Sequence, residues 1–186
     1  MVKISHYQII KTLSRNRDGV FLVKDINTNQ LALLKHRNIK FLKAEYDALM
    51  LCKGIGVPKV LEFNEKYEIL VLEYDSKAKT LLDLQEDDIP LLTNIFPKII
   101  ANISRIHDKG LVHGDIKPSN ILISQYLIKI IDFGAATRLN TNYEMLEQYE
   151  FTPKKLNRNN ENVSLYINDY LALKYYMDMR FNLYKN

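Results

Sequence analysis

The chain has 186 residues, of which 47% are hydrophobic and 26% are charged, and this composition excludes a disordered chain, a collagen-like repeat and a low-complexity linker. Its formal net charge is +4, but the basic residues are scattered among acidic ones, so no nucleic-acid partner is indicated. A single cysteine, Cys52, excludes an internal disulfide and a cysteine-based zinc site and favours a reducing compartment. The apolar runs are too short to span a membrane, so we expect a soluble cytoplasmic protein with no membrane partner.

The first 74 residues predict an antiparallel sheet with one helix. Turn-prone residues separate five runs that are rich in branched and aromatic side chains. Between the third and fourth runs, Phe41, Glu45 and Leu49 recur at four-residue intervals, which predicts a helix over 39–52. The five predicted strands are 7–13, 20–25, 31–36, 59–63 and 67–74.

The chain after residue 74 has a mainly helical pattern. A long helix is predicted from Asp87 or Asp88 onward because isoleucine and leucine recur on one face, and Pro97 inside it predicts a kink or a later start. Shorter elements are also predicted: a helical segment near 80–84, strands at 121–123 and 128–131, an asparagine-rich loop at 140–162 and a last helix at about 164–181.

Two stretches carry residue types that indicate chemistry, His113-Gly-Asp-Ile-Lys-Pro-Ser-Asn120 and, twelve residues later, Asp132-Phe-Gly134. Two carboxylates, a carboxamide and a lysine on loops at strand ends suit phosphoryl transfer, because that chemistry depends on positioning and on neutralising phosphate charge. Asp132 and Asn120 offer oxygen ligands for Mg²⁺. Asp115 is the candidate acceptor of a hydroxyl proton, and Lys117 offsets charge on the transferred group.

These two motifs resemble the catalytic and metal-binding loops of the eukaryotic-like protein kinase family. The resemblance implies an α+β fold with two lobes in one domain that covers 1–186. The smaller lobe, about 1–74, is a five-stranded antiparallel sheet with one helix, and the larger lobe, about 75–186, is mainly helical and shortened. It also implies ATP and Mg²⁺ as cofactors. The pattern Asp-x-Lys-Pro-x-Asn is similar to the Ser/Thr version of the loop, which implies phosphoryl transfer to serine and threonine hydroxyls of a protein substrate.

Lys35 lies on the same face of its predicted strand as Leu31 and Leu33, where an unpaired ammonium is costly to bury. Glu45 on the following helix is the available carboxylate, and the pair resembles the family's strand lysine and helix glutamate that hold the phosphates. Their spacing of ten residues is short for the family, so the helix must begin almost directly after the strand. The alternative is a surface lysine and a solvated glutamate.

The family's glycine-rich loop over the phosphates is reduced here to its third glycine, Gly19, with Phe21 on the strand after it. Ser14 and Asn16 stand where the first two glycines would lie, so the backbone approaches phosphate less easily. The two arginines beside them either contact phosphate instead or are solvated turn charges. We expect Gly19 and Phe21 to contribute to nucleotide binding.

The strand that ends at Tyr74 resembles the kinase hinge, whose backbone hydrogen-bonds adenine. Glu73 and Tyr74 occupy the hinge positions, and Leu72 stands where access to the back of the pocket is controlled. The resemblance therefore assigns Leu72, Glu73 and Tyr74 to the nucleotide site.

Two features of the larger lobe bear on regulation and on the shape of the catalytic loop. Gly114 stands where the family usually has an arginine that pairs with a phosphorylated activation loop, so we expect activity without loop phosphorylation. Asp169 is similar to the aspartate of the family's central helix that anchors the catalytic loop through backbone amides. An exposed helix aspartate is the alternative.

Thr152, in Phe151-Thr-Pro153, resembles the threonine that bridges the catalytic aspartate and lysine of Ser/Thr kinases. The resemblance therefore predicts a bridge from Thr152 to Asp115 and Lys117. No Ala-Pro-Glu motif follows it, unlike in most members of the family.

Two other functions remain open at this level. The first is a small-molecule kinase for antibiotics, sugars or lipopolysaccharide, because His-Gly-Asp also occurs in such enzymes. The second is a nucleotide-binding pseudokinase scaffold that acts through a partner protein, because the glycine-rich loop is degraded. Lys117-Pro118 favours the protein kinase, and the presence of Lys35, Asp115, Asn120 and Asp132 together counts against a scaffold.

The shortened larger lobe resembles that of small bacterial effector kinases, which places the protein in a bacterial cytosol or, if it is secreted, in a host cytosol. We expect an activating partner protein on the larger lobe, against the apolar face of the last helix. That face carries Leu165, Tyr166, Leu173 and Tyr176. The histidines at 6, 36 and 107 show no metal-binding spacing and are expected at the surface or at helix ends.

Overall fold

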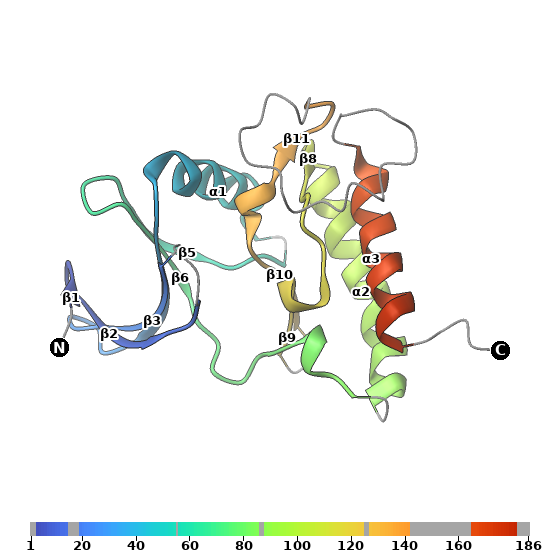
Figure 1. Cartoon of the computed structure of the whole chain (residues 1–186), viewed down its shortest axis with the longest axis horizontal. Helices are drawn as coiled ribbons and strands as arrows, with labels where there is room; N and C mark the ends of the chain where they lie inside the picture. The colour runs from blue at the N-terminus through green and yellow to red at the C-terminus, as the bar shows by residue number, and fades with distance from the viewer. Residues whose placement is uncertain are drawn as a thin grey trace. The chain divides into compact units, whose positions relative to one another are not determined.

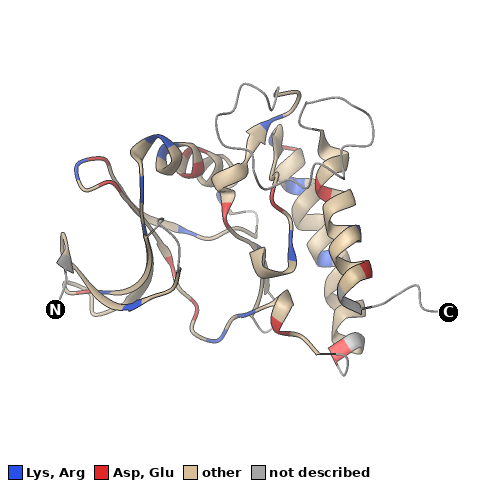
Figure 2. Cartoon of the chain, viewed as in Figure 1, with Lys and Arg blue, Asp and Glu red and all other residues tan. Residues whose placement is uncertain are grey.

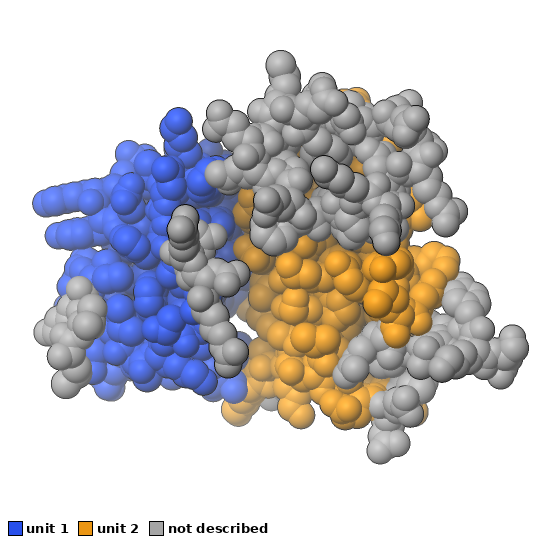
Figure 3. Space-filling model, in the orientation of Figure 1, with its two compact units in different colours: residues 1–53, 58–76 blue, residues 54–57, 77–186 orange. Residues whose placement is uncertain are grey.

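The computed structural model describes residues 3–14, 19–54, 56–85, 88–124, 127–141 and 165–181. It divides into two units, which Figure 3 shows in different colours, and Figure 1 labels their helices and strands. Unit 1 consists of Met1–Lys53 and Pro58–Ser76, and unit 2 consists of Gly54–Val57 and Lys77–Asn186. Lysine and arginine are interspersed with acidic residues in both units (Figure 2), as the sequence indicates.

Unit 1 is an antiparallel sheet with one helix, α1 (Ile39–Leu51). All five predicted strands are present, and a two-residue strand at the edge adds a sixth, β1. The strand order is β1-β2-β3-β4-β6-β5. The strands are β1 (Lys3–Ile4), β2 (Tyr7–Thr12), β3 (Gly19–Asp25), β4 (Leu31–His36), β5 (Val60–Asn64) and β6 (Ile69–Glu73).

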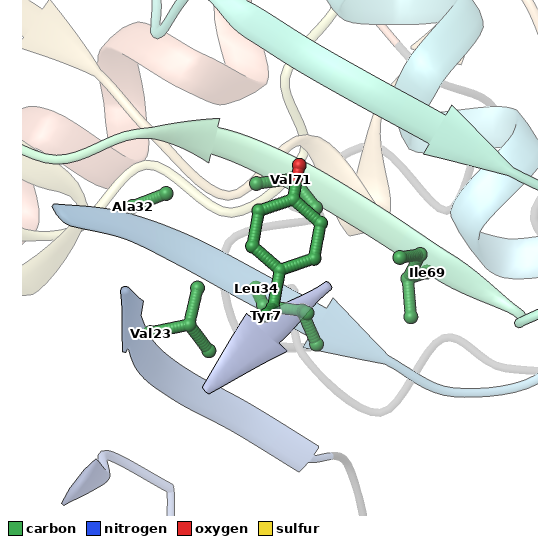
Figure 4. Close-up of a cluster of buried hydrophobic side chains, with 6 residues drawn as sticks. All are labelled: Tyr7, Val23, Ala32, Leu34, Ile69 and Val71. Carbon is green, nitrogen blue, oxygen red and sulfur yellow. The ribbon is translucent and has the colours of Figure 1, made fainter. Parts of the chain in front are cut away.

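The core of unit 1 follows from the two-residue period of its strands. One face buries a cluster shown in Figure 4, made of Tyr7, Val23, Ala32, Leu34, Ile69 and Val71. The alternate residues of β6, Leu70 and Leu72, are also buried, because α1 packs against β5 and β6. Strand β6 is therefore buried on both faces, and its residues 69–72 are all apolar.

The sheet of unit 1 is curled. Tyr7 on β2 donates a hydrogen bond from its hydroxyl to Glu62 on β5 at 2.8 Å, although these two strands are not neighbours in the sheet. Burial, together with the Glu62 carboxylate, raises the pKa of Tyr7. The closure holds β2 and β5 around the cluster of Figure 4.

The connection from β4 to α1 consists of Arg37 and Asn38 alone. Asn38 caps the helix, because its side chain accepts a hydrogen bond from the backbone N–H of Lys40 at 3.0 Å. The prediction that the helix begins almost directly after the strand is confirmed. Beyond the helix, Gly54 has a φ of +85°, as expected of a residue that ends a helix.

Unit 2 is built around two packed helices, α2 (Ile89–His107) and α3 (Tyr166–Phe181). Pro97 lies inside α2, and the helix runs from Ile89 to His107, so the alternative of a later start is wrong. Small sheets flank the helices in the orders β10-β9-β7 and β11-β8. Their strands are β7 (Lys79–Thr80), β8 (Leu111–Val112), β9 (Ile121–Ser124), β10 (Leu127–Ile130) and β11 (Thr137–Arg138), and 3₁₀ turns occupy Leu81–Asp83, Pro118–Asn120 and Phe133–Ala135.

The segment Gly54–Val57 belongs to unit 2, where Gly56 is hydrogen-bonded to β10 and lies against Asn102 of α2. Gly56 accepts a hydrogen bond at its carbonyl from the N–H of Ile130 at 2.9 Å. Its φ is +53°, and a Cβ there would lie 2.3 Å from Nδ2 of Asn102, so only glycine fits. The same Nδ2 donates to the carbonyl of Ile128 at 2.8 Å. In the described part of the chain, no helix is long and apolar enough to cross a membrane.

Candidate active site

Lys35 and Glu45 form the predicted contact in unit 1. Lys35 Nζ donates to Glu45 Oε1 at 2.6 Å, and the exposed fractions of the two residues are 7% and 0%. The register explains the geometry, since Lys35 lies opposite Leu70 on β6, on the face that α1 covers. The alternative of a surface lysine and a solvated glutamate is therefore wrong.

Arg37 joins this pair, a contact that the strand and helix patterns did not predict. Its Nη2 donates to Glu45 Oε2 at 2.8 Å, so each oxygen of the buried carboxylate receives one cation. A signal was present in the strand period, because Arg37 is two residues after Lys35 and so lies on the same side of the chain. The predicted strand, 31–36, ends one residue before Arg37 and therefore leaves Arg37 out.

The remaining candidates in unit 1 lie on two strands, β3 and β6, and directly after β6. Gly19 begins β3 opposite His36, and Phe21 is half-buried opposite Leu34. The predicted loop that precedes Gly19 falls partly on residues 15–18, which lie outside the described residues. Leu72, Glu73 and Tyr74 come at the end of β6, and only Leu72 among them is buried.

Glu73 is hydrogen-bonded to Lys59, the residue directly before β5. Its N–H donates to the carbonyl of Lys59 at 2.9 Å, and its side chain accepts from the N–H of Lys59 at 2.7 Å. The carboxylate of Glu73 therefore accepts a hydrogen bond from another residue of unit 1. A hinge role for Glu73 would depend on its backbone carbonyl.

In unit 2 the catalytic-loop candidates gather around the Asp115 carboxylate. Lys117 Nζ donates to Asp115 Oδ2 at 2.6 Å, and Asn120 Nδ2 donates to the same oxygen at 2.9 Å. Asn120 Nδ2 also donates to the backbone carbonyl of Asp115 at 2.9 Å. With its nitrogen turned to Asp115, Asn120 directs its amide oxygen away from the carboxylate, which is the orientation that a metal ligand needs.

His113 links this loop to the segment that carries Asp132. The N–H of Asp115 donates to His113 Nδ1 at 3.2 Å, so Nδ1 is the acceptor and the ring donates from Nε2 to the carbonyl of Ile131 at 3.1 Å. The N–H of Ile131 in turn donates to the carbonyl of Asn120 at 2.9 Å. These bonds fix Asp115 and Asn120 relative to the residue before Asp132.

Asp132 has left-handed backbone angles, with a φ of +66°, directly before a 3₁₀ turn. Phe133 follows fully buried, edge-on to the His113 ring at 4.7 Å between centroids. The buried phenyl ring holds the turn, so the unusual backbone of Asp132 is maintained by packing. The carboxylate of Asp132 and the amide oxygen of Asn120 are hard oxygen donors, which fit Mg²⁺ that completes its shell with phosphate oxygens.

Asp169 on α3 anchors the catalytic loop, as predicted. Its Oδ2 accepts from the N–H of His113 at 2.8 Å, and its Oδ1 accepts from the N–H of Gly114 at 2.9 Å. The residue is 1% exposed, so the alternative of a surface aspartate is wrong. His107 Nε2 also lies 2.9 Å from Asp169 Oδ2.

His107 ends α2, as expected of a helix-end residue, but it is buried, so a surface position for this histidine is wrong. Its ring stacks on Tyr166 at 4.5 Å and meets Tyr170 edge-on at 5.1 Å. The contact between His107 and Asp169 spans 62 residues of sequence. Local periodicity carries no signal for such a contact.

Gly114 has a φ of +77°, and a Cβ there would lie 2.6 Å from the carbonyl oxygen of Ala135. Two loops of the site therefore approach closely at this point, and no larger residue fits without a shift. Thr152 and its predicted bridge to Asp115 and Lys117 lie outside the described residues. In the portion that the structure describes, no group of three or more His, Cys, Asp or Glu side chains is placed to hold a metal ion.

Residues 6–156 match the protein kinase domain family. The chain is similar to Serine/threonine-protein kinase 1 of African swine fever virus (isolate Pig/Kenya/KEN-50/1950), with 37% identity over 150 residues that cover 73% of this chain and 48% of the viral protein. A probable serine/threonine-protein kinase of Saccharomyces cerevisiae is 39% identical over 109 residues, which cover 53% of this chain and 10% of the yeast protein. Citron Rho-interacting kinase of Mus musculus is 29% identical over 150 residues, which cover 76% of this chain and 7% of the mouse protein. This chain thus spans about half or less of the length of these relatives.

Proposed function

The chain belongs to the protein kinase family, and from this premise we propose that it transfers the terminal phosphoryl group of ATP to serine and threonine hydroxyls of a protein substrate. One observation carries the proposal: Asp115, Lys117 and Asn120 share a hydrogen-bonded loop that His113 ties to the backbone before Asp132. The viral and yeast relatives are named as serine/threonine-protein kinases, which supports the same class of acceptor.

In the proposed reaction, Asp115 orients the acceptor hydroxyl and takes its proton as the new oxygen–phosphorus bond forms, while the bond from the γ-phosphorus to the β–γ bridging oxygen breaks and ADP leaves. Lys117, 2.6 Å from Asp115, offsets negative charge on the group in transfer. Thr152 remains proposed as a bridge between these two residues. Asp132 and Asn120 would hold Mg²⁺, which supplies charge neutralisation at the phosphates.

Unit 1 is proposed to bind the nucleotide. Lys35, oriented by Glu45, would contact the phosphates, and Gly19 and Phe21 would lie along them. Leu72, Glu73 and Tyr74 would form the hinge that binds adenine. The buried ammonium of Lys35 supports the phosphate-binding role, and the place of the three hinge residues at the end of β6 supports the adenine-binding role.

An activating partner protein on unit 2 is part of the proposal, but its surface differs from the expected one. Leu173 is 1% exposed, so the inclusion of Leu173 in an open face is wrong. Among the described side chains of α3, the exposed apolar ones are Ile167, Tyr175 and Met179, which recur at multiples of four residues. A partner would contact this stripe. A shortened larger lobe, a bacterial effector role and a bacterial or host cytosolic location stay predictions.

The test compares two aspartates in the purified chain. With Mg²⁺, ATP and a mixed protein acceptor, we expect phosphoserine and phosphothreonine to form. Asp115→Ala should keep its affinity for Mg·ATP and lose transfer by about 10³-fold or more, whereas Asp132→Ala should lose metal-dependent nucleotide binding as well.

Equal loss of ATP binding in both variants would show that the roles are misassigned. Phosphorylation of sugar or antibiotic acceptors without protein phosphorylation would support the small-molecule kinase. Nucleotide binding without any transfer, including in the presence of cell lysate as a source of partner, would support the scaffold.

A further inference from the structure

The carboxylate of Glu45 is shared between two cations. Oε1 accepts from Lys35 Nζ at 2.6 Å and Oε2 accepts from Arg37 Nη2 at 2.8 Å. The Glu45 side chain is 0% exposed, and those of Lys35 and Arg37 are 9% and 16% exposed. The three side chains therefore form a nearly buried triad with a net charge of +1.

The two-residue connection explains why Arg37 reaches Glu45. Strand β4 ends at His36 and α1 begins at Ile39, so Arg37 cannot move far from the first turns of the helix. Asn38 fixes the connection further by capping α1. A longer connection would let this side chain turn to solvent.

The two cations of the triad have separate tasks. Burying a carboxylate is costly unless its oxygens are hydrogen-bonded, and in this structure Lys35 donates to one of them, Oε1. Arg37 covers Oε2, which leaves Oε1 to orient Lys35.

We propose that Arg37 is a positioning residue that holds Glu45, and through it Lys35, in the arrangement that receives the nucleotide phosphates. The inference rests on the proposed function, and it adds to the lysine–glutamate pair a second cation that acts before nucleotide binds. Arg37 acts through Glu45 and needs no contact with the nucleotide.

The test is a double-mutant cycle in the full chain, with the dissociation constant of Mg·ATP measured by displacement of a fluorescent nucleotide and with kcat measured separately. Arg37→Gln should weaken Mg·ATP binding about tenfold, as loss of one charge-assisted hydrogen bond would, and should lower kcat less. Arg37→Lys should recover most of the affinity. Glu45→Gln should weaken binding at least as much, and the double variant should match Glu45→Gln alone.

Lys43→Met is the matched control. Lys43 pairs with Asp47 at 2.6 Å on the same helix, but both side chains are about half exposed, so its loss should leave Mg·ATP binding unchanged. Urea denaturation of each variant shows whether it is folded, and Arg37→Lys keeps the test informative if Arg37→Gln unfolds.

Three outcomes would overturn the inference. Effects of Arg37→Gln and Glu45→Gln that add would mean that Arg37 acts independently of Glu45. Tighter binding in Arg37→Gln would mean that the guanidinium competes with Lys35, and unchanged binding would mean that the contact is only structural. Because the readout is nucleotide binding, a chain that binds Mg·ATP without transferring phosphate would refute the proposed function and still test Arg37.

Discussion

Among the described residues, each unit contains one fully buried carboxylate, and the two are hydrogen-bonded by different kinds of partner. Glu45 in unit 1 receives the ends of two long side chains, Lys35 and Arg37. Asp169 in unit 2 receives two backbone N–H groups and the ring of His107. Their exposed fractions, 0% and 1%, are nearly equal, so the kind of partner is the difference.

This difference indicates which site can adjust. Lysine and arginine reach Glu45 on flexible stems, so they can shift when an anion binds nearby without any change in the backbone. The amides that bind Asp169 belong to the loop itself, so the loop is fixed as long as the carboxylate is present. Under the proposed function, the side chains around Glu45 can thus adjust to nucleotide phosphates, whereas the loop at His113 and Gly114 is held by its backbone.

Loss of Asp169 should have the largest effect of the changes considered. Asp169→Ala leaves two buried N–H groups and His107 without their acceptor, and we expect the free energy of unfolding to fall by about 3–5 kcal/mol. Phosphoryl transfer should be lost with it, because Asp115 follows the two anchored residues. Urea denaturation measured by circular dichroism, together with a turnover assay, checks both. A fall below about 1 kcal/mol would mean that the loop holds its shape without the carboxylate.

Glu45→Gln should lower the free energy of unfolding less than Asp169→Ala does, because the side chains that bind Glu45 can change position. Lys35 and Arg37 can move toward solvent on their stems once the carboxylate is neutral, so we expect a loss of about 1–3 kcal/mol in the free energy of unfolding. Mg·ATP binding should fall while the catalytic loop of unit 2 stays intact. Hydrogen exchange at the amides of His113 and Gly114 measures this: faster exchange in Glu45→Gln would contradict the separation between the units.

The strands, the helices and the pairing of Lys35 with Glu45 were predictable from the sequence, because an element that buries only one face shows a regular apolar pattern. A strand period of two and a helix period of about four mark the elements, and a lysine on an apolar strand face required an anion, which identified Glu45. His107 and Gly114 were not predictable in the same way. The contact of His107 crosses 62 residues, and the positive φ of Gly114 leaves no trace in the pattern of apolar residues.

Gly114→Ala tests how closely the loops of unit 2 approach. We expect a loss of about 1–3 kcal/mol, because alanine at a φ of +77° is strained and its Cβ would meet the carbonyl oxygen of Ala135. Gly54→Ala is the matched control, since Gly54 has a φ of +85° with nothing within 4 Å of an added methyl group. The control should lose only about 1 kcal/mol. Equal losses in urea denaturation would show that the close contact with Ala135 carries no energy.

The smallest effect is expected at an exposed carboxylate, Asp83. It tests whether burial is the reason why Glu45 and Asp169 have larger effects on stability. Its side chain accepts from the N–H and the hydroxyl of Thr80 at 2.7 and 2.8 Å, and these bonds lower the pKa of Asp83. A carboxyl whose pKa is lower in the folded state stabilises the fold above its ordinary pKa, and this stabilisation is lost as the pH falls through the lowered value. Wild type should therefore lose on the order of 0.5 kcal/mol more than Asp83→Asn between pH 5 and about pH 3, because an exposed pair is screened by solvent. Parallel stability–pH curves for the two proteins would mean that the bonds to Thr80 contribute nothing to stability. A change in the free energy of unfolding as large as that caused by Glu45→Gln would mean that burial does not determine how strongly a carboxylate stabilises this chain.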